Sequence, residues 1–371
     1  MIRIVVFFLV IAAVLGVLLL INIYPCRRIA VLLGISRPRR PAPPTAGLAA
    51  VFLAMAVSFP LAMLLARRMD GPAVNAYYVV SATWLGLVFL GCAVFGILHI
   101  IQRASHFLRH PIPPRLVGFL SIGLTLAGGS YAVINAAAVR TTRVTIKLAG
   151  LERPARIVQI SDVHLGAVYG PGFLSKLVER TNALRPDLVA VTGDLFDGSG
   201  RLDYSMVRPL ENLSASAFFV TGNHENYEGA DECAALVSRA GVRVLRNESA
   251  DCCGLQIIGM DTPQSGRAHA RHLGANLPAL DPSKPSVLLY HIPLGLEQAA
   301  ARGIDLMLSG HTHNGQIFPF TLFMPLAYRH YSGQGRLNGL DIVVSQGAGT
   351  WGPPMRIGSK SEIVVVDLVP E

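Results

Sequence analysis

Four long stretches of uncharged, apolar residues occupy the first part of the chain. They run over residues 4–24, 47–66, 76–101 and 116–139. Each is about as long as a helix that crosses the hydrocarbon core of a bilayer, and Arg-rich connectors separate them. The first stretch is also compatible with a signal sequence, but no small-residue cleavage pattern follows it, which favours an uncleaved helix. The pattern predicts a transmembrane region of four helices over residues 1–140.

The periodicity changes after Thr141. β-Branched residues alternate with polar ones from 143 to 148, and apolar runs then alternate with amphipathic segments. The expected strands cover 156–160, 188–192, 217–221, 255–260, 287–290, 306–309, 342–345 and 363–368. The expected helices cover 172–184, 205–213, 228–240 and 294–302. This alternation predicts a layered α/β domain over residues 150–371.

Charge divides the chain at the same place as hydropathy. Residues 1–150 carry fourteen Lys or Arg against a single acid, Asp70, which gives a net charge of +13. Residues 151–371 carry eighteen against twenty-two, a net −4, so the basic excess belongs to the apolar part. A nucleic-acid-binding domain needs its basic surface where it contacts phosphates. The α/β domain is therefore not expected to bind nucleic acid.

Basic residues are distributed unevenly between the two sides of the predicted spans. The connectors after the first and third spans hold eight Arg, whereas the opposite side holds six Lys or Arg. By the positive-inside rule, this bias places those connectors in the cytoplasm. The expected location is the cytoplasmic (inner) membrane, in a multi-pass topology, with the α/β domain on the extracytoplasmic side.

Polar clusters follow five of the predicted strands, at the ends where α/β sheets usually build their sites. The clusters are Asp162-Val163-His164, Gly193-Asp194, Gly222-Asn223-His224-Glu225, His291 and Gly310-His311-Thr312-His313. Carboxylate oxygens and imidazole nitrogens suit first-row divalent ions such as Mn²⁺, Fe²⁺ or Zn²⁺. Two such ions, about 3.5–4 Å apart, activate a hydroxide and neutralise charge at a phosphorus atom. The clusters therefore predict a dinuclear, metal-dependent phosphoester hydrolase.

The five clusters, in this order, resemble the signature of the calcineurin-like metallophosphoesterase superfamily, which reads D-x-H, G-D, G-N-H-[ED], H and G-H-x-H. The resemblance extends over residues 156–368. Within the superfamily, segments 311–316 and 349–358 resemble the bacterial membrane-associated branch related to YkuE and YaeI. The resemblance implies a four-layer α/β sandwich, in which two sheets are flanked by helices.

The resemblance also implies a role for each polar residue. The implied metal ligands are Asp162, His164 and His313 for the first ion, Asn223, His291 and His311 for the second, and Asp194 as the bridge between them. His224 is implied to contact the phosphate and to stabilise or protonate the leaving oxygen. The expected catalytic residues are Asp194 and His224, and the expected cofactors are two divalent ions, Mn, Fe or Zn.

One departure from the family pattern bears on the substrate. Several phosphatase branches carry Arg at the end of a G-D-x-x-D-R motif, but this chain has Gly198 there. Without that charged clamp, a phosphate monoester dianion binds less well, which favours phosphodiester or pyrophosphate substrates. Asp197 of the same motif has two open interpretations: it supports a metal-binding histidine, or it is an ordinary loop acid.

The segment 318–326 is rich in large apolar side chains and follows the last metal-binding cluster closely. It either packs over the sheet or faces the bilayer or an acyl chain, with His330 near the head group. Trp351 lies in the family tail and is expected to line the same cleft. The candidate substrate-binding residues are Arg329, Tyr331 and Arg356. The expected partners are the membrane and a phosphoester substrate, which the second interpretation makes lipid-linked.

The leading hypothesis is thus a membrane-anchored metallophosphoesterase, and three alternatives stay open. One is a lipid-precursor hydrolase of the UDP-diacylglucosamine pyrophosphohydrolase type. Another is a non-catalytic scaffold, although such proteins usually lose metal ligands and this chain keeps all seven. The third is a channel or transporter, which the few polar residues of the apolar stretches disfavour. The absence of a C-x-x-C pair gives no support to a structural zinc site.

Overall fold

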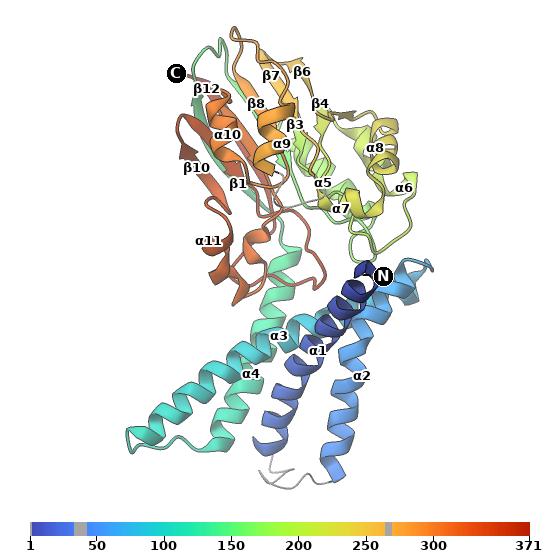
Figure 1. Ribbon diagram of the computed structural model, residues 1–371, viewed down its shortest axis with the longest axis vertical. Helices are drawn as coiled ribbons and strands as arrows, with labels where there is room; N and C mark the ends of the chain where they lie inside the picture. Colours follow the sequence, from blue (N-terminus) through green and yellow to red (C-terminus); the bar gives the residue numbers. More distant parts are fainter. Residues whose placement is uncertain (1, 33–42, 264–268) are drawn as a thin grey trace.

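A helical region supports a two-sheet α/β domain in the computed structural model (Figure 1). The structure describes residues 2–32, 43–263 and 269–371, with side chains for 16–31, 46–263 and 269–371. The helices of the first region are α1 (Ile2–Leu32), α2 (Pro43–Ala66), α3 (Pro72–Phe107) and α4 (Pro114–Ala137). The last three begin at proline, whose missing N–H would have no partner in the first turn of a helix.

Three helices in the described part of the chain are long and apolar enough to cross a membrane. They are residues Ala46–Ala66 of α2, together with α3 and α4. The expectation of four spans is therefore wrong for the residues that the structure describes. The first predicted span, 4–24, coincides with α1, but the side chains of residues 2–15 lie outside the described part.

The α/β domain contains two mixed sheets of six strands each. The first has the order β1 (Arg140–Leu148), β12 (Glu362–Pro370), β2 (Ala155–Ile160), β3 (Leu188–Val191), β4 (Ser216–Phe219) and β5 (Arg243–Val244). The second has the order β10 (Gly333–Leu337), β11 (Leu340–Val344), β9 (Leu306–Ser309), β8 (Ser286–Leu289), β7 (Leu255–Gly259) and β6 (Glu248–Cys252). Neighbouring strands are parallel except in the pairs β12–β2, β10–β11 and β6–β7.

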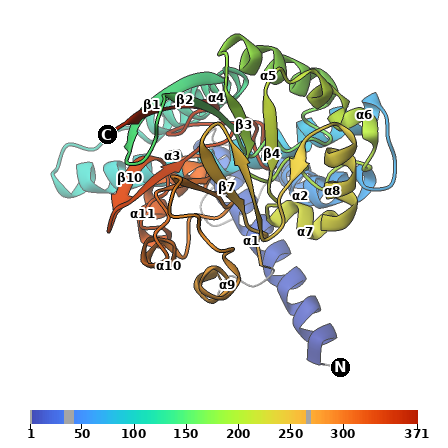
Figure 2. The same ribbon diagram turned by 90° about the horizontal axis from the view of Figure 1, so that it is seen from above.

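Four layers result from strands with two buried faces. Neighbouring residues of a strand point to opposite sides of its sheet. In β2, Ile157 therefore faces the second sheet, whereas Val158 packs against outer helices. The outer helices are α5 (Pro171–Ala183) and α8 (Ala230–Arg239) on the first sheet, and α9 (His269–Asn276) and α10 (Leu296–Ala301) on the second (Figure 2). This arrangement has the expected two sheets and flanking helices.

Several strands differ from the sequence prediction or were absent from it. β1 begins at Arg140 and pairs with β12 over its whole length, so the α/β fold starts in the interval left between the two predicted regions. β5, β6 and β10 were missed, and each lies at the edge of a sheet. An edge strand need not bury both faces, so it lacks the continuous apolar run that identifies a central strand.

The shorter helices surround the edge of the domain that faces the helical region (Figure 1). They are α6 (Tyr204–Val207), α7 (Asn223–Glu228), α11 (Met324–Ala327) and the 3₁₀ segments Arg208–Asn212, His313–Gly315 and Phe320–Phe323. The predicted helix 205–213 is thus divided into α6 and a 3₁₀ segment. Pro209 lies at the start of that segment, where it ends the α-helical hydrogen bonding.

The two regions are joined by direct contacts of α3 and α4 with the tail of the chain. Met355 is wholly buried and packs with Ala132 of α4 and Leu87 of α3. Asn135 of α4 donates to the backbone oxygens of Arg356 and Ser359 at 3.0 and 2.9 Å. Asn135 therefore fixes the segment that contains Arg356 and Ser359 to α4.

Candidate metal centre

The loops that follow five strands bring the predicted ligands to one place. Each ligand comes within a few residues of its strand: Asp162 and His164 after β2, Asp194 after β3, Asn223 after β4, His291 after β8, and His311 and His313 after β9. All five strands run in parallel within their own sheets, so their carboxyl ends meet along one edge of the sandwich. The ligands come from both sheets.

Three overlapping groups of side chains have their ligand atoms within 4.8 Å of one another. The groups are Asp162, His164 and His313; His164, Asp194 and His224; and Asp194, His291 and His311. Asp194 belongs to the second and third groups, and a carboxylate shared in this way can contact two ions. The second group shares His164 with the first and Asp194 with the third, and it also includes His224.

The ligand atoms of these side chains lie about as close as hydrogen-bonded atoms do. The Nε2 atoms of His164 and His313 lie 3.1 Å apart, and Nε2 of His313 lies 3.3 Å from Oδ1 of Asp162. Nε2 of His291 lies 3.0 Å from Oδ2 of Asp194. Among the described residues, Oδ1 of Asn223 is buried without a hydrogen-bond partner. Since buried polar atoms are normally paired, this donor set fits divalent metal ions.

The backbone at the ligands is strained. Asp162, His164, Asp194, His311 and His313 all have positive φ angles, between 48° and 71°. This left-handed region is unfavourable for residues other than glycine, and each such residue costs about 1–3 kcal/mol when it lies in a sparsely populated conformation. Strain of this kind persists only where surrounding structure imposes it. Here it turns ligands from separate loops toward a common space.

Two glycines are required by close approach between the ligand loops. A Cβ atom on Gly193 would lie 2.7 Å from Nδ1 of His291 and 2.8 Å from the backbone nitrogen of Gly222. A Cβ atom on Gly222 would lie 2.6 Å from the backbone nitrogen of Asp194. The glycines of the G-D and G-N-H-E motifs thus let two loops touch, which brings Asp194 beside the first turn of α7.

Glu225 binds these two loops together, a role that the sequence analysis missed. Its carboxylate accepts backbone N–H groups from Gly222 at 2.6 Å, Leu195 at 2.8 Å, Asp194 at 3.0 Å and Phe196 at 3.2 Å. Burial and the Asp194 carboxylate raise the pKa of Glu225 to about 7, against the effect of these donors. Its place as the last letter of G-N-H-E was the only sequence signal.

The charges of the cluster are those that a divalent ion requires. Burial lowers the pKa of His311 and of His313 to about 4, so both imidazoles are neutral at pH 7. Burial acts to raise the pKa of Asp162 and of Asp194, but His313 and His291 respectively hold both below the usual range. Burial lowers the pKa of His291, yet Asp194 raises it to about 10. A cation beside Asp194 would displace that proton.

The second ring nitrogens of two histidines accept or donate a hydrogen bond, and that of a third lies beside a carboxylate without one. Nδ1 of His291 lies 2.7 Å from the backbone oxygen of Thr192, and Nδ1 of His224 lies 2.9 Å from that of Asp197. Nδ1 of His164 lies 3.4 Å from Oδ1 of Asp197. Asp197 thus lies beside His164, a predicted metal ligand, which is the position expected if Asp197 supports a metal-binding histidine. Such neighbours fix the orientation of the ring that faces a metal.

The three candidate substrate-binding residues lie in different surroundings. Arg356 is wholly buried, and its guanidinium donates to the backbone oxygens of Gly349 at 2.8 Å and His313 at 3.2 Å. Arg356 therefore supports the loop that carries His313 and does not line an open cleft. Arg329 pairs with Glu297 at 3.2 Å, with both side chains exposed. The backbone oxygen of Tyr331 accepts the Thr312 hydroxyl at 2.5 Å.

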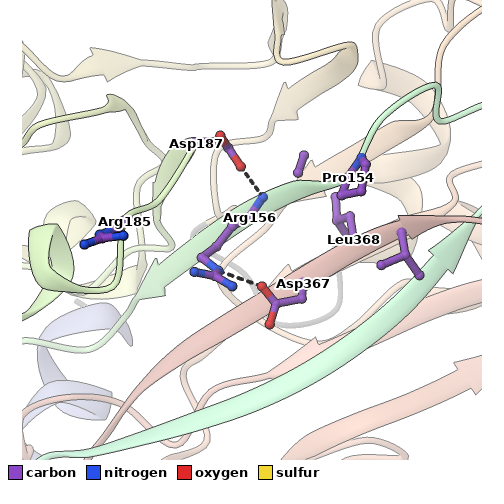
Figure 3. Close-up of a pocket in the computed structure, with 8 residues that line it drawn as sticks. Pro154, Arg156, Arg185, Asp187, Asp367 and Leu368 are labelled. Carbon is purple, nitrogen blue, oxygen red and sulfur yellow. Dashed lines mark hydrogen bonds and ion pairs between the residues drawn. The ribbon is translucent and has the colours of Figure 1, made fainter.

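A hollow of about 350 Å³ lies at a different edge of the domain (Figure 3). It is at the amino ends of β2 and β3, whereas the ligand cluster follows their carboxyl ends. Arg156 donates to Asp367 at 2.6 Å, and Asp187 accepts the backbone N–H of Arg156 at the same distance. Because these charged groups already have partners, we place the active site at the ligand cluster instead.

Comparisons with known proteins agree with this geometry. A family model described as "Calcineurin-like phosphoesterase" matches residues 155–315. The chain is 34% identical to an "Uncharacterized metallophosphoesterase" of Helicobacter pylori, over 69% of this chain and 72% of that one. It is 31% identical to the bovine "Transmembrane protein with metallophosphoesterase domain", over 85% and 78% of the two chains. It is 28% identical to YkuE of Bacillus subtilis, an "Uncharacterized metallophosphoesterase", over 68% and 94%.

Replacement of Glu225 by Gln tests the role of its carboxylate. The amide keeps the size of the side chain but replaces one acceptor oxygen with a donor, which leaves backbone N–H groups of the ligand loops unpaired. A buried unpaired donor costs about 1–3 kcal/mol, so we expect a lower unfolding temperature for the α/β domain in a calorimetric scan. Glu232→Gln, at an exposed position of α8, is the control. Equal unfolding temperatures for the two variants would contradict the role.

Proposed function

The chain belongs to the calcineurin-like metallophosphoesterase family, and from this premise we propose that it hydrolyses phosphodiester or pyrophosphate bonds with two divalent ions. Membership of the family indicates a metal-dependent phosphoester hydrolase. The observation that carries the proposal is the buried cluster in which Asp194 belongs to two ligand groups. When bound there, the ions supply an activated water and neutralise charge at phosphorus.

The residues of the chain contribute binding and proton transfer. We assign Asp162, His164 and His313 to one ion, Asn223, His291 and His311 to the other, and Asp194 to both. His224 lies beside the cluster, with its ring centroid 4.7 Å from that of His164. Its Nδ1 is held by the backbone oxygen of Asp197, which leaves Nε2 to face the substrate. We assign His224 to contact with the phosphate and to stabilisation of the leaving oxygen or, when both ring nitrogens carry a proton, to its protonation.

The surroundings of Gly198 support a preference for diesters over monoesters. Gly198 has a φ angle of 85°, and a Cβ atom there would lie 2.7 Å from Oε1 of Glu228. An arginine would therefore be strained at this position and would meet a carboxylate. The nearby Arg67 guanidinium is already paired with Glu228, so without an arginine from this loop the site compensates one negative charge of a phosphodiester more readily than two charges of a monoester.

Hydrolysis of bis-p-nitrophenyl phosphate by the detergent-solubilised chain with Mn²⁺ tests the proposal. We expect Asp194→Ala to abolish activity, because it removes the shared ligand. We expect His224→Ala to reduce the rate by about 10²- to 10⁴-fold while Mn²⁺ still binds, as measured by equilibrium dialysis. The control is His272→Ala, on α9 and outside the cluster.

Three outcomes would overturn the proposal. The wild-type chain must bind Mn²⁺ and lose its activity when a chelator removes the ion. It must also hydrolyse bis-p-nitrophenyl phosphate faster than p-nitrophenyl phosphate, since a faster reaction with the monoester would reverse the assigned preference. Full activity of Asp194→Ala would exclude the cluster as the site.

We further propose that the substrate is lipid-linked and that the chain is anchored in a membrane. Leu322 and Leu326 lie in the segment after the last ligand loop and are 63% and 83% exposed. The ring of Phe320, in the same segment, lies 5.4 Å from that of Phe89 on α3, a candidate span. Trp351, also exposed, lies 6.4 Å from the ring of His224. One exposed apolar segment thus touches a candidate span, and the exposed Trp351 lies beside the site, which supports substrates at a membrane surface.

Charged substitutions in this segment test the membrane contact. Leu322→Asp and Leu326→Asp should lower kcat/KM by about 10-fold or more for a phosphodiester lipid in vesicles, because insertion of a leucine into an apolar phase contributes about 1.5–3 kcal/mol. Hydrolysis of soluble bis-p-nitrophenyl phosphate should be unchanged. Ala275→Asp, at an exposed position of α9, is the matched control. Equal losses with both substrates would contradict the lipid proposal.

We place the α/β domain on the extracytoplasmic side of the inner membrane, on the basis of the Arg-rich connectors. Eight basic residues on one side of the apolar stretches against six on the other give this orientation. A reporter enzyme fused after Glu371 should be active only if it functions outside the cytoplasm. Activity of a reporter that requires the cytoplasm would reverse the placement.

A further inference from the structure

A short loop after the second ligand cluster lies between the ligands and the helical region. It consists of Asp197, Gly198 and Ser199. The Asp197 side chain is 6% exposed and lies 3.4 Å from Nδ1 of His164, an assigned metal ligand. The Ser199 hydroxyl donates to Oδ2 of the same carboxylate. The position of this loop therefore determines what surrounds His164 on the side away from the cluster.

Helix α3 supplies a second donor to this carboxylate. The hydroxyl of Tyr78 donates to Oδ2 of Asp197 at 3.5 Å, across 119 positions of sequence. Tyr78 is 2% exposed, and its ring lies 5.6 Å from that of Phe59 on α2. Ala167, which follows the first ligand loop, packs in the same cluster. The tyrosine is thus held by α2 and α3 and reaches into the α/β domain.

Arg67, in the turn directly after α2, holds the next residue of the same loop. Nε of Arg67 donates to the backbone oxygen of Gly198 at 2.9 Å. Its Nη2 lies 3.5 Å from Oε1 of Glu228, which follows the G-N-H-E motif by three residues. Helix α3 and the turn after α2 therefore contact the Asp197 loop independently, one at the side chain of Asp197 and one at the adjacent carbonyl.

We propose that Tyr78 is a positioning residue for the metal centre. By holding the Asp197 carboxylate, it fixes the orientation of the His164 ring, so that the helical region completes the support of a metal ligand. A buried carboxylate needs donors for its oxygens, and Tyr78 and Ser199 are the two side chains that donate to Oδ2 in the described structure. The inference rests on the proposed function, because it concerns the same metal site.

Removal of one hydroxyl tests this inference. Tyr78→Phe keeps the ring and its packing but removes the donor to Asp197. Loss of a neighbour that orients a metal ligand typically lowers metal affinity by 10–100-fold, and Tyr78 acts one contact further away. We therefore expect a dissociation constant for Mn²⁺ that is about 3- to 10-fold higher in the full chain, measured from free Mn²⁺ by electron paramagnetic resonance. Tyr77→Phe, at the adjacent half-buried tyrosine of α3, is the matched control.

A double-mutant cycle separates positioning from a general effect on folding. Asp197→Ala removes the group through which Tyr78 acts, so adding Tyr78→Phe to it should change Mn²⁺ affinity no further. Additive effects, or an unchanged affinity in Tyr78→Phe alone, would overturn the inference. A wild-type chain that binds no Mn²⁺ would overturn the proposed function instead. Unfolding temperatures of all variants identify any loss that comes from misfolding.

Discussion

The arrangement of the candidate metal centre depends on the need to compensate two buried carboxylates. Asp162 and Asp194 lie almost without exposure at the edge of a dense apolar core, where an unpaired charge is costly. The chain alone compensates them with histidines, of which His291 takes up a proton beside Asp194. Divalent metal ions would compensate these negative charges more strongly than histidines do. Because Asp194 belongs to two ligand groups, the other ligands are arranged around it. The strained ligand backbones and the bare glycines around them serve the same convergence.

The core of the sandwich makes that convergence possible. The central strands bury both faces, so their ends cannot shift without disturbing packing on two sides. Loops fixed in this way can hold five ligands in the left-handed region. Glu225 adds a local restraint by joining two loops, and Arg356 adds another beneath His313. Ligand geometry is therefore a property of the whole domain rather than of the individual loops.

The sequence predicted those parts that leave a local signal. Central strands have continuous apolar runs, and the five polar clusters follow them directly, so the layered fold and the ligand cluster could be anticipated. Edge strands such as β10 carry little apolar signal. The contact of Tyr78 with Asp197 could not be read from the sequence, because it joins segments 119 positions apart, and the burial of Arg356 depends on how the loops of His313 and Gly349 fold around its guanidinium. Such contacts depend on how regions dock, which periodicity does not describe.

The place of β12 in the first sheet has a consequence for biosynthesis. This strand lies between β1 and β2, which are made more than two hundred residues before it. While the ribosome is still producing the intervening chain, the sheet has a gap where β12 belongs, and its two earlier neighbours cannot pair through it. Every assigned ligand is synthesised before β12, yet the sheet that carries three of the ligand loops closes only when β12 arrives. Assembly of the centre is thereby delayed until almost the whole described chain has been made.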